Sequence, residues 1–127
     1  DTVRRQRQMC IRDSFLSDRA ADMQILLEEL MRSARQINAD PTLPARLREE
    51  MGLLPDLPQE LVDEITPYYE TAVKQGMFVE DGGGLPAALG DFEFLIASGG
   101  LKGPASSLDP ENFWNFGLLD KAKAALN

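Results

Sequence analysis

The chain has 127 residues, which is room for one domain or for part of one. It carries 13 Lys and Arg against 21 Asp and Glu, a formal net charge of -8. This balance argues against a nucleic-acid-binding protein, because such proteins gain affinity mainly from basic side chains on phosphates. There is no His and only one Cys, so the commonest general base, an internal disulfide and a thiolate zinc cluster are excluded. No run of about 18 apolar residues predicts a membrane-spanning helix.

The first 14 residues differ in composition from the rest. They hold four of the 13 basic residues and the only cysteine, Cys10. Residues 9–14, MCIRDS, resemble the translation of an adapter used in sequencing libraries, with which metagenomic gene sequences often begin. We therefore interpret residues 1–14 as an artefact outside the fold, and the alternative is a basic, disordered arm. On either interpretation Cys10 receives no function.

From residue 15 onward, apolar residues recur at helical spacing. The first predicted helix has Ser17 as its N-cap and ends at 38–40, because Pro41 keeps the preceding residue out of the helical region. One face of this helix is apolar and is expected to turn toward the core: Met23, Leu26, Leu27, Leu30, Ala34 and Ile37.

Two more helices are predicted in the middle of the chain. A short helix covers 43–51, with Pro44 in its first turn and Gly52 as the residue that ends it. A longer helix runs from about 58 to 75. Pro67 inside it predicts either a kink or two helices that meet there, because proline removes a backbone hydrogen bond. The expected buried side of the longer helix consists of Leu61, Val62, Ile65, Tyr69, Ala72 and Val73.

The last third of the chain is predicted to hold shorter helices. The glycines at 82–84 indicate a mobile loop before a fourth helix at about 86–98, and residues 109–111, DPE, are a typical helix start. This start predicts a short aromatic helix over 113–116, and a final helical turn or two over 118–126. The inner face of the fourth helix is expected to consist of Leu89, Phe92, Leu95 and Ile96. No sustained alternation predicts a strand, so the expected fold is mainly α with five to six helices.

Few motifs in the chain carry chemistry. The glycines at 82–84 lack the Lys and Ser/Thr of a P-loop and follow two acids, so we interpret them as a flexible linker. The pairs Glu28-Glu29 and Glu49-Glu50 are interpreted as solvated, because adjacent residues on a helix point in different directions. Tyr68-Tyr69 and the aromatic residues of 113–116 are interpreted as packing residues. The sequence thus predicts no catalytic, cofactor-binding or metal-binding residue.

Several short sequence segments, taken in their order along the chain, resemble the C-terminal segment of periplasmic substrate-binding proteins of ABC transporters. The similar classes are those for nitrate, sulfonate and taurine and for thiamine-pyrimidine precursors. The turn INADP at 37–41 is similar to the end of that family's long helix, and 57–78 is similar to the helix before its last lobe. GDFEF at 90–94 and ENFWNF at 111–116 resemble segments near the C-terminal end of that family's sequences. The resemblance covers 113 of the 127 residues, and it departs from the family at Asp40, where Asn is usual.

This resemblance implies both a fold and a function. Residues 15–127 would form the helical C-terminal part of a two-lobed α/β periplasmic-binding-protein fold. Such a protein captures a small anion or heterocycle for import and is not an enzyme. The implied partners are a small-molecule ligand and an ABC permease, without nucleic acid, cofactor or membrane span. The whole protein would be periplasmic, or extracellular and lipid-anchored, although no signal is visible in this chain. Ligand contacts in that family lie mostly upstream, so no binding residue is carried over.

An alternative function comes from a different class of protein. The chain would then be a freestanding helical interaction module that offers an apolar groove to a partner helix. The two interpretations differ in the surface they predict. A piece of a lobe leaves exposed the apolar side chains that would cover a missing sheet, whereas a freestanding module closes its own core.

Overall fold

The computed structural model describes residues 13–127, and this part of the chain is helical without any strand. The mainly α fold and the number of helices predicted from the sequence are confirmed. Cys10 and the rest of residues 1–12 lie outside the described part, while Asp13 and Ser14 form the first turn of a helix. The α-helices are α2 (Asp13–Asp18), α3 (Ala20–Ala39), α4 (Leu43–Met51), α5 (Gln59–Lys74), α6 (Gly84–Ala97) and α7 (Gly117–Leu126), and two 3-10 turns cover Ala105–Ser107 and Pro110–Asn112.

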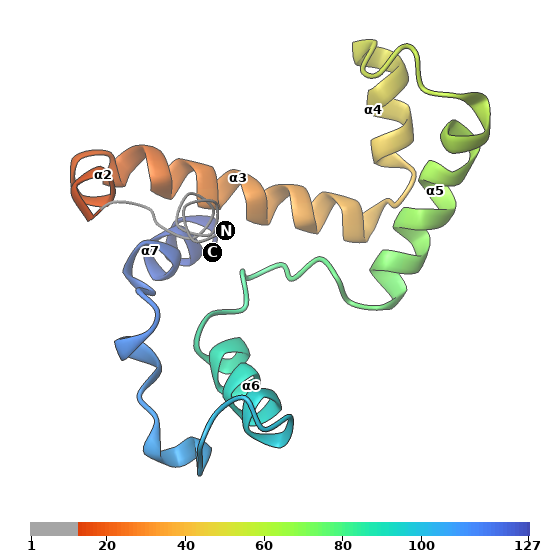
Figure 1. Cartoon of the computed structure of the whole chain (residues 1–127). Coiled ribbons are helices and arrows are strands. Elements are labelled where there is room, and N and C mark those ends of the chain that lie inside the picture. The colour runs from red at the N-terminus through yellow and green to blue at the C-terminus, as the bar shows by residue number, and fades with distance from the viewer. Residues whose placement is uncertain (1–12) are drawn as a thin grey trace.

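The helices are arranged openly around α3 (Figure 1). α7 packs along α3, and α4 packs against α5 beyond the other end of α3. α6 contacts the two 3-10 turns rather than the long helix. The side chain of Asn38 ties the connector after α5 to the end of α3, because its Nδ2 donates to the Phe78 carbonyl at 2.8 Å and to Glu80 Oε1 at 3.1 Å. No described helix is long and apolar enough to cross a bilayer.

The start of the long helix differs from the prediction. Ser17 lies inside α2, where its Oγ donates to the Ser14 carbonyl at 3.0 Å, so it does not cap α3. The chain leaves helical geometry at Arg19, with φ −119° and ψ 28°, and α3 begins at Ala20. The N-cap prediction was wrong because serine can satisfy its hydroxyl on a carbonyl three residues back.

The turn between α3 and α4 lies at the position predicted from the sequence. Asp40 Oδ1 accepts from the Thr42 hydroxyl at 2.6 Å and from the Thr42 amide at 3.0 Å, and Oδ2 accepts from Arg46 at 3.0 Å. The hydrogen bonds from Thr42, and then the Arg46 guanidinium, hold the pKa of the Asp40 carboxyl below its ordinary value. Gly52 ends α4 in the left-handed conformation, at φ 62°, as predicted.

Pro67 does not divide α5, which is one helix from end to end. Of the two outcomes predicted for Pro67, a kink or two helices, the second is wrong. Proline at this position leaves the carbonyl of Asp63 without its helical partner, but Asp63 and Pro67 are both exposed, so water can bind that carbonyl. Ala72 is buried as predicted, whereas Leu61 is exposed.

The C-terminal third contains less helix than the aromatic pattern predicted. Asp109 accepts from the Glu111 amide at 3.0 Å, which confirms the predicted cap. However, the turn that it starts ends at Asn112, and no helix covers 113–116. The predicted aromatic helix was wrong because all four of its residues are aromatic or Asn, types with only moderate helix propensity, and the Asn115 side chain accepts from the Gly117 amide. Gly117 starts α7, which covers the predicted final turns.

The core of the described residues is small. Three of its five buried apolar residues are alanines, and the only large ones are Met31 and Phe92. Eighteen large apolar side chains are exposed, among them Leu89 and Leu95, which were expected on the inner face of α6. Several helices therefore have apolar faces that no other element of the described residues covers.

Candidate functional site: an apolar groove between α3 and α7

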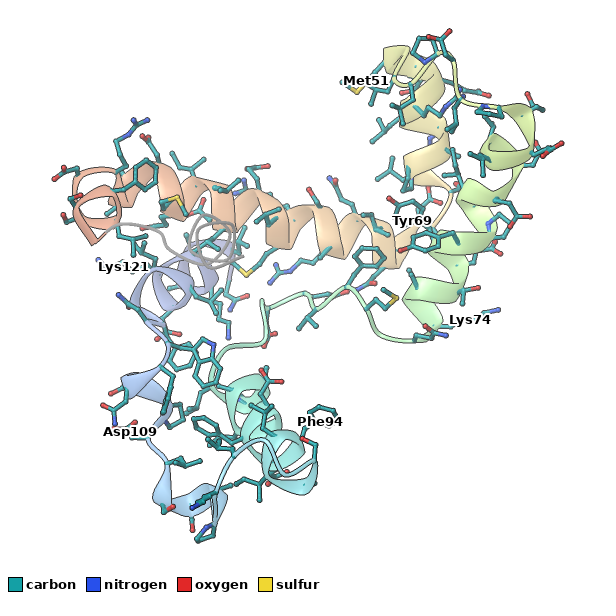
Figure 2. All side chains as sticks on the ribbon, viewed as in Figure 1. Met51, Tyr69, Lys74, Phe94, Asp109 and Lys121 are labelled. Atoms are coloured by element: carbon teal, nitrogen blue, oxygen red, sulfur yellow. The ribbon has the colours of Figure 1, made fainter. Side chains whose placement is uncertain are left out.

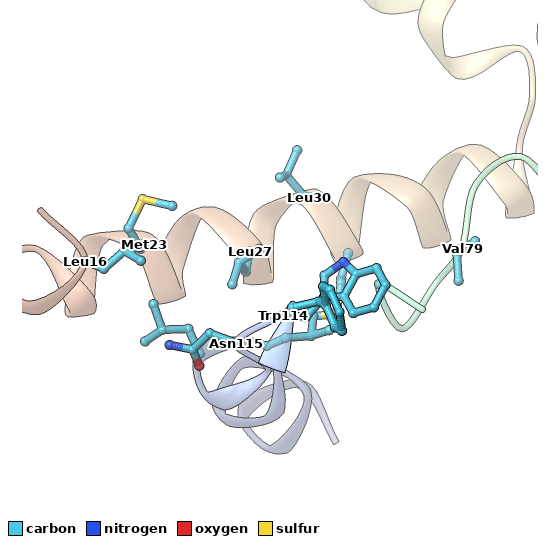
Figure 3. A pocket seen from close by; sticks show the side chains of 12 residues that line it. Leu16, Met23, Leu27, Leu30, Val79, Trp114 and Asn115 are labelled. Carbon is cyan, nitrogen blue, oxygen red and sulfur yellow. The ribbon is translucent and has the colours of Figure 1, made fainter. Parts of the chain in front are cut away.

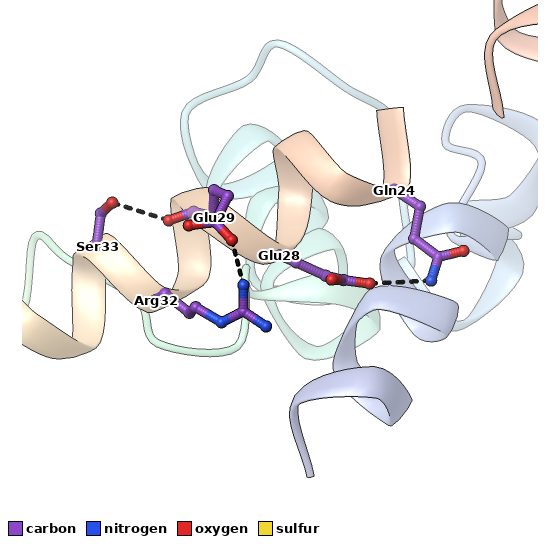
Figure 4. A network of polar contacts seen from close by, with 5 residues as sticks. All are labelled: Gln24, Glu28, Glu29, Arg32 and Ser33. Carbon is purple, nitrogen blue, oxygen red and sulfur yellow. Dashed lines mark hydrogen bonds and ion pairs between the residues drawn. The ribbon is translucent and has the colours of Figure 1, made fainter. Parts of the chain in front are cut away.

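The two members of the pair Glu28-Glu29 have different partners. Figure 4 shows Glu28 and Glu29 turned to different partners on α3. Gln24 donates to Glu28 at 3.0 Å, whereas Glu29 pairs with Arg32. Glu49 and Glu50 are exposed at the end of α4. No group of three or more metal-binding side chains occurs within residues 13–127.

Side chains of the chain itself bond to the glycine loop before α6 and to each other. Asp81 Oδ1 accepts from the Gly83 amide at 2.9 Å, and Lys123 Nζ lies 3.6 Å from Asp81 Oδ2. The Gly83 amide, followed by Lys123, lowers the pKa of Asp81. A phosphate-binding loop needs free backbone amides, and here a carboxylate already takes one of them. The ion pair of Asp81 with Lys123 therefore links the loop before α6 to α7.

Gly82 has a packing reason to be glycine. Its φ is +72°, and a Cβ built on it would lie 2.6 Å from Leu119 Cδ1 on α7. Gly76 has a similar φ of +68°, but a Cβ there would meet nothing within 4 Å. The two positions share the same backbone strain and differ only in the neighbouring side chain.

We expect Gly82→Ala to lower the free energy of unfolding by about 1–2 kcal/mol more than Gly76→Ala does. Both variants force alanine into the left-handed region, at about 1–2 kcal/mol each, but only in Gly82→Ala does the added Cβ collide with a side chain, that of Leu119, which must move. Urea unfolding followed by circular dichroism measures both values. Equal losses in the two variants would show that the contact between Gly82 and Leu119 is absent.

A groove of about 620 Å³ lies where α3, α7 and two connectors meet (Figure 3). Most of its lining is apolar, and among residues 13–127 its polar side-chain groups come from Trp114 and Asn115. Asn115 is itself engaged, because its Oδ1 accepts from the Gly117 amide at 3.0 Å. The principal lining residues are Leu16, Met23, Leu27, Leu30, Val79, Trp114, Asn115, Leu118 and Leu119.

Aromatic residues form two separate clusters. Phe92 lies against Phe113 and Trp114, with ring centroids 5.5 Å and 5.3 Å away, and Trp114 also lines the groove. Tyr69 stacks on Phe78 at 5.8 Å. The rings of Tyr69 and Trp114 contact other rings, as the packing interpretation expects, whereas Tyr68 and Phe113 are largely exposed.

The groove could not be found from sequence patterns, because its walls come from three distant parts of the chain. Residues 16–31, 79–82 and 113–119 converge only after α7 packs on α3. Chemically, the groove can hold apolar groups, since none of its lining residues from the described part of the chain is an acid, a base or a cation. Its only sequence signal is the apolar face of the first helix.

Comparisons of the chain with protein-family models, with curated proteins and with solved structures found no significant match.

Proposed function

We propose that the chain is the helical C-terminal segment of a periplasmic substrate-binding protein of an ABC transporter, in the nitrate, sulfonate and taurine class or the thiamine-pyrimidine-precursor class. The whole protein captures a small anion or heterocycle for import, delivers it to a permease, and does no chemistry. Within it, residues 15–127 pack on one lobe and position that lobe, while the ligand contacts come from other residues.

The observation that carries this proposal is the exposed apolar surface. Exposed large apolar side chains occur on each helix from α3 to α6, whereas only two such side chains are buried among the described residues (Figure 2). A lobe piece has this surface because its helices cover a sheet that other residues supply. Representative exposed positions are Leu26 and Leu30 on α3, Met51 on α4, Leu61 on α5, and Leu85 and Phe94 on α6.

The departure from the family at position 40 is compatible with the proposal. The amide and hydroxyl of Thr42 both bond to Oδ1 of Asp40, an acceptor that asparagine also has. Only the ion pair with Arg46 needs the second carboxylate oxygen, and both partners are about half exposed. An exposed pair of this kind contributes little stability, so either residue serves the turn.

The second candidate, a freestanding helical interaction module, is favoured by the groove between α3 and α7. A cavity of about 620 Å³ with an apolar lining suits the apolar face of a partner helix. This candidate accounts for the groove alone. It leaves the exposed apolar side chains of α4, α5 and α6 without a role.

The test compares the whole protein with the 127-residue chain. We expect the gene sequence upstream of Phe15 to encode two α/β lobes, and the whole protein to bind nitrate, a small sulfonate or a pyrimidine in calorimetric titrations. The chain alone is expected to bind none of them, because it lacks the cleft. Micromolar affinity of the chain alone, or an upstream sequence without α/β lobes, would contradict the proposal.

A further inference from the structure

The connector between α5 and α6 (Figure 1) contains the only aspartate of the chain that is followed by glycine, Asp81-Gly82. An aspartate before glycine is the pair most prone to cyclise, because glycine has no side chain to shield its backbone nitrogen from the carboxyl group. The Asp81 side chain is 59% exposed, and Gly82 is exposed as well. Both reacting groups are therefore accessible to water, which the reaction releases and then consumes.

The backbone at Asp81 is not held by secondary structure. Within residues 13–127, neither the amide nor the carbonyl of Asp81 forms a backbone-to-backbone hydrogen bond. The Gly82 amide donates to the Val79 carbonyl at 3.3 Å, which is long for such a bond. The two residues after Gly82 are also glycines, which change their backbone angles at little steric cost. The main chain can therefore rotate around Asp81 more easily than it could inside a helix.

The carboxyl group of Asp81 is folded back along the chain, and two partners keep it ionised. Its Oδ1 accepts from the Gly83 amide at 2.9 Å, which closes a ring around the peptide bond between Asp81 and Gly82 and keeps Cγ near the Gly82 nitrogen. Its Oδ2 lies 3.6 Å from Lys123 Nζ. A carboxylate loses an oxygen less readily than a carboxylic acid does, so the geometry favours cyclisation while the ion pair opposes it.

We propose that Asp81 isomerises spontaneously to isoaspartate and that the ion pair with Lys123 slows this reaction. The Gly82 nitrogen attacks Asp81 Cγ, and the proton of the nitrogen leaves with the hydroxyl of the carboxyl group as water, which gives a cyclic succinimide. Water then opens the ring at the main-chain carbonyl carbon of Asp81, so the chain continues through Cγ and a carboxylate remains on Cα. One water molecule leaves and one enters, and nothing is oxidised or reduced. The inference does not depend on the proposed function.

The product has a different loop before α6. Its main chain is longer by one methylene group, and its carboxylate is attached directly to Cα. Such a carboxylate is displaced from the positions in which Asp81 meets the Gly83 amide and Lys123, so the link between this loop and α7 is lost. The inserted group also lies beside Gly82, which has no room next to Leu119. Isomerisation therefore loosens the loop from α7.

The unmodified 127-residue chain tests the reaction. After weeks of warm incubation at neutral pH in heavy-oxygen water, cleavage after lysine releases residues 75–102, which contain both Asp81 and Asp91. Mass spectrometry is expected to find heavy oxygen and the isoaspartate fragmentation pattern at Asp81. Asp91 is the internal control, because it is exposed but lies within α6 and precedes the buried Phe92. Absence of isoaspartate at Asp81, or equal amounts at both aspartates, would overturn the proposal.

Two lysine variants test the role of the ion pair. Lys123→Met removes the cation beside Asp81 and is expected to speed isoaspartate formation about two- to fivefold, the range that corresponds to an exposed ion pair. Lys121→Met is the matched control, because Lys121 is exposed on the same helix and forms no ion pair within the described residues, and its rate should equal that of the parent chain. Equal rates in the two variants, with helix content preserved in circular dichroism, would refute the role of Lys123.

Discussion

Replacing Phe92 by alanine is expected to lower the free energy of unfolding by about 3–5 kcal/mol. Phe92 is the largest fully enclosed side chain in the described residues, at 2% exposure, and Phe113 and Trp114 pack on its ring edge to face. Truncation removes the apolar contact area and leaves a cavity that these neighbours fill only in part. Urea unfolding followed by circular dichroism measures the loss, and Trp114 fluorescence reports the local change.

The matched control for this variant is Phe94→Ala, two residues along the same helix. Phe94 is 71% exposed. Its removal is expected to change the free energy of unfolding by less than about 0.5 kcal/mol. Similar losses for both variants would mean that Phe92 is not enclosed in solution and that α6 does not pack on the aromatic segment.

Replacing Ala122 by leucine is expected to cost about 1–3 kcal/mol of stability. Ala122 lies on α7 with 0% of its surface exposed, where this helix packs along α3. Leucine is a good helix former, so the change acts through overpacking and not through helix propensity. The three added carbons push α7 away from α3 and widen the groove. Thermal unfolding measures the loss, and Trp114 fluorescence reports the wider groove.

Ala124→Leu is the control for this variant, because Ala124 is exposed on the same helix. It adds the same atoms to α7 outside the contact with α3, and its stability is expected to stay within about 0.5 kcal/mol of the parent chain. A loss in Ala124→Leu equal to that in Ala122→Leu would indicate that α7 presents a different face to α3.

Local chemistry made the helix limits predictable. Pro41 and Gly52 mark where α3 and α4 end, and Asp109 caps its turn, because each acts through its own backbone or a neighbour within a few residues. Ser17 is of a residue type that commonly caps helices, but its hydroxyl donates to the Ser14 carbonyl instead. The fold class followed from the 3.6-residue period, which needs no knowledge of long-range contacts.

Burial and sites were harder to predict, because periodicity shows which face of a helix is apolar but not whether another element covers it. Leu61, Leu89 and Leu95 lie on apolar faces and are nevertheless exposed. The groove between α3 and α7 combines segments that only tertiary packing brings together.

The contact between α3 and α7 also has a consequence for the order of folding. It joins residues 20–39 to residues 117–126, so a loop of more than half the chain must close before the contact forms. The α4–α5 pair needs only a short connector and can form first, since the entropy lost on loop closure rises with loop length. We therefore expect the docking of the final ten-residue helix to be the last step of folding, and until that step the residues of α3 that α7 contacts stay open to water.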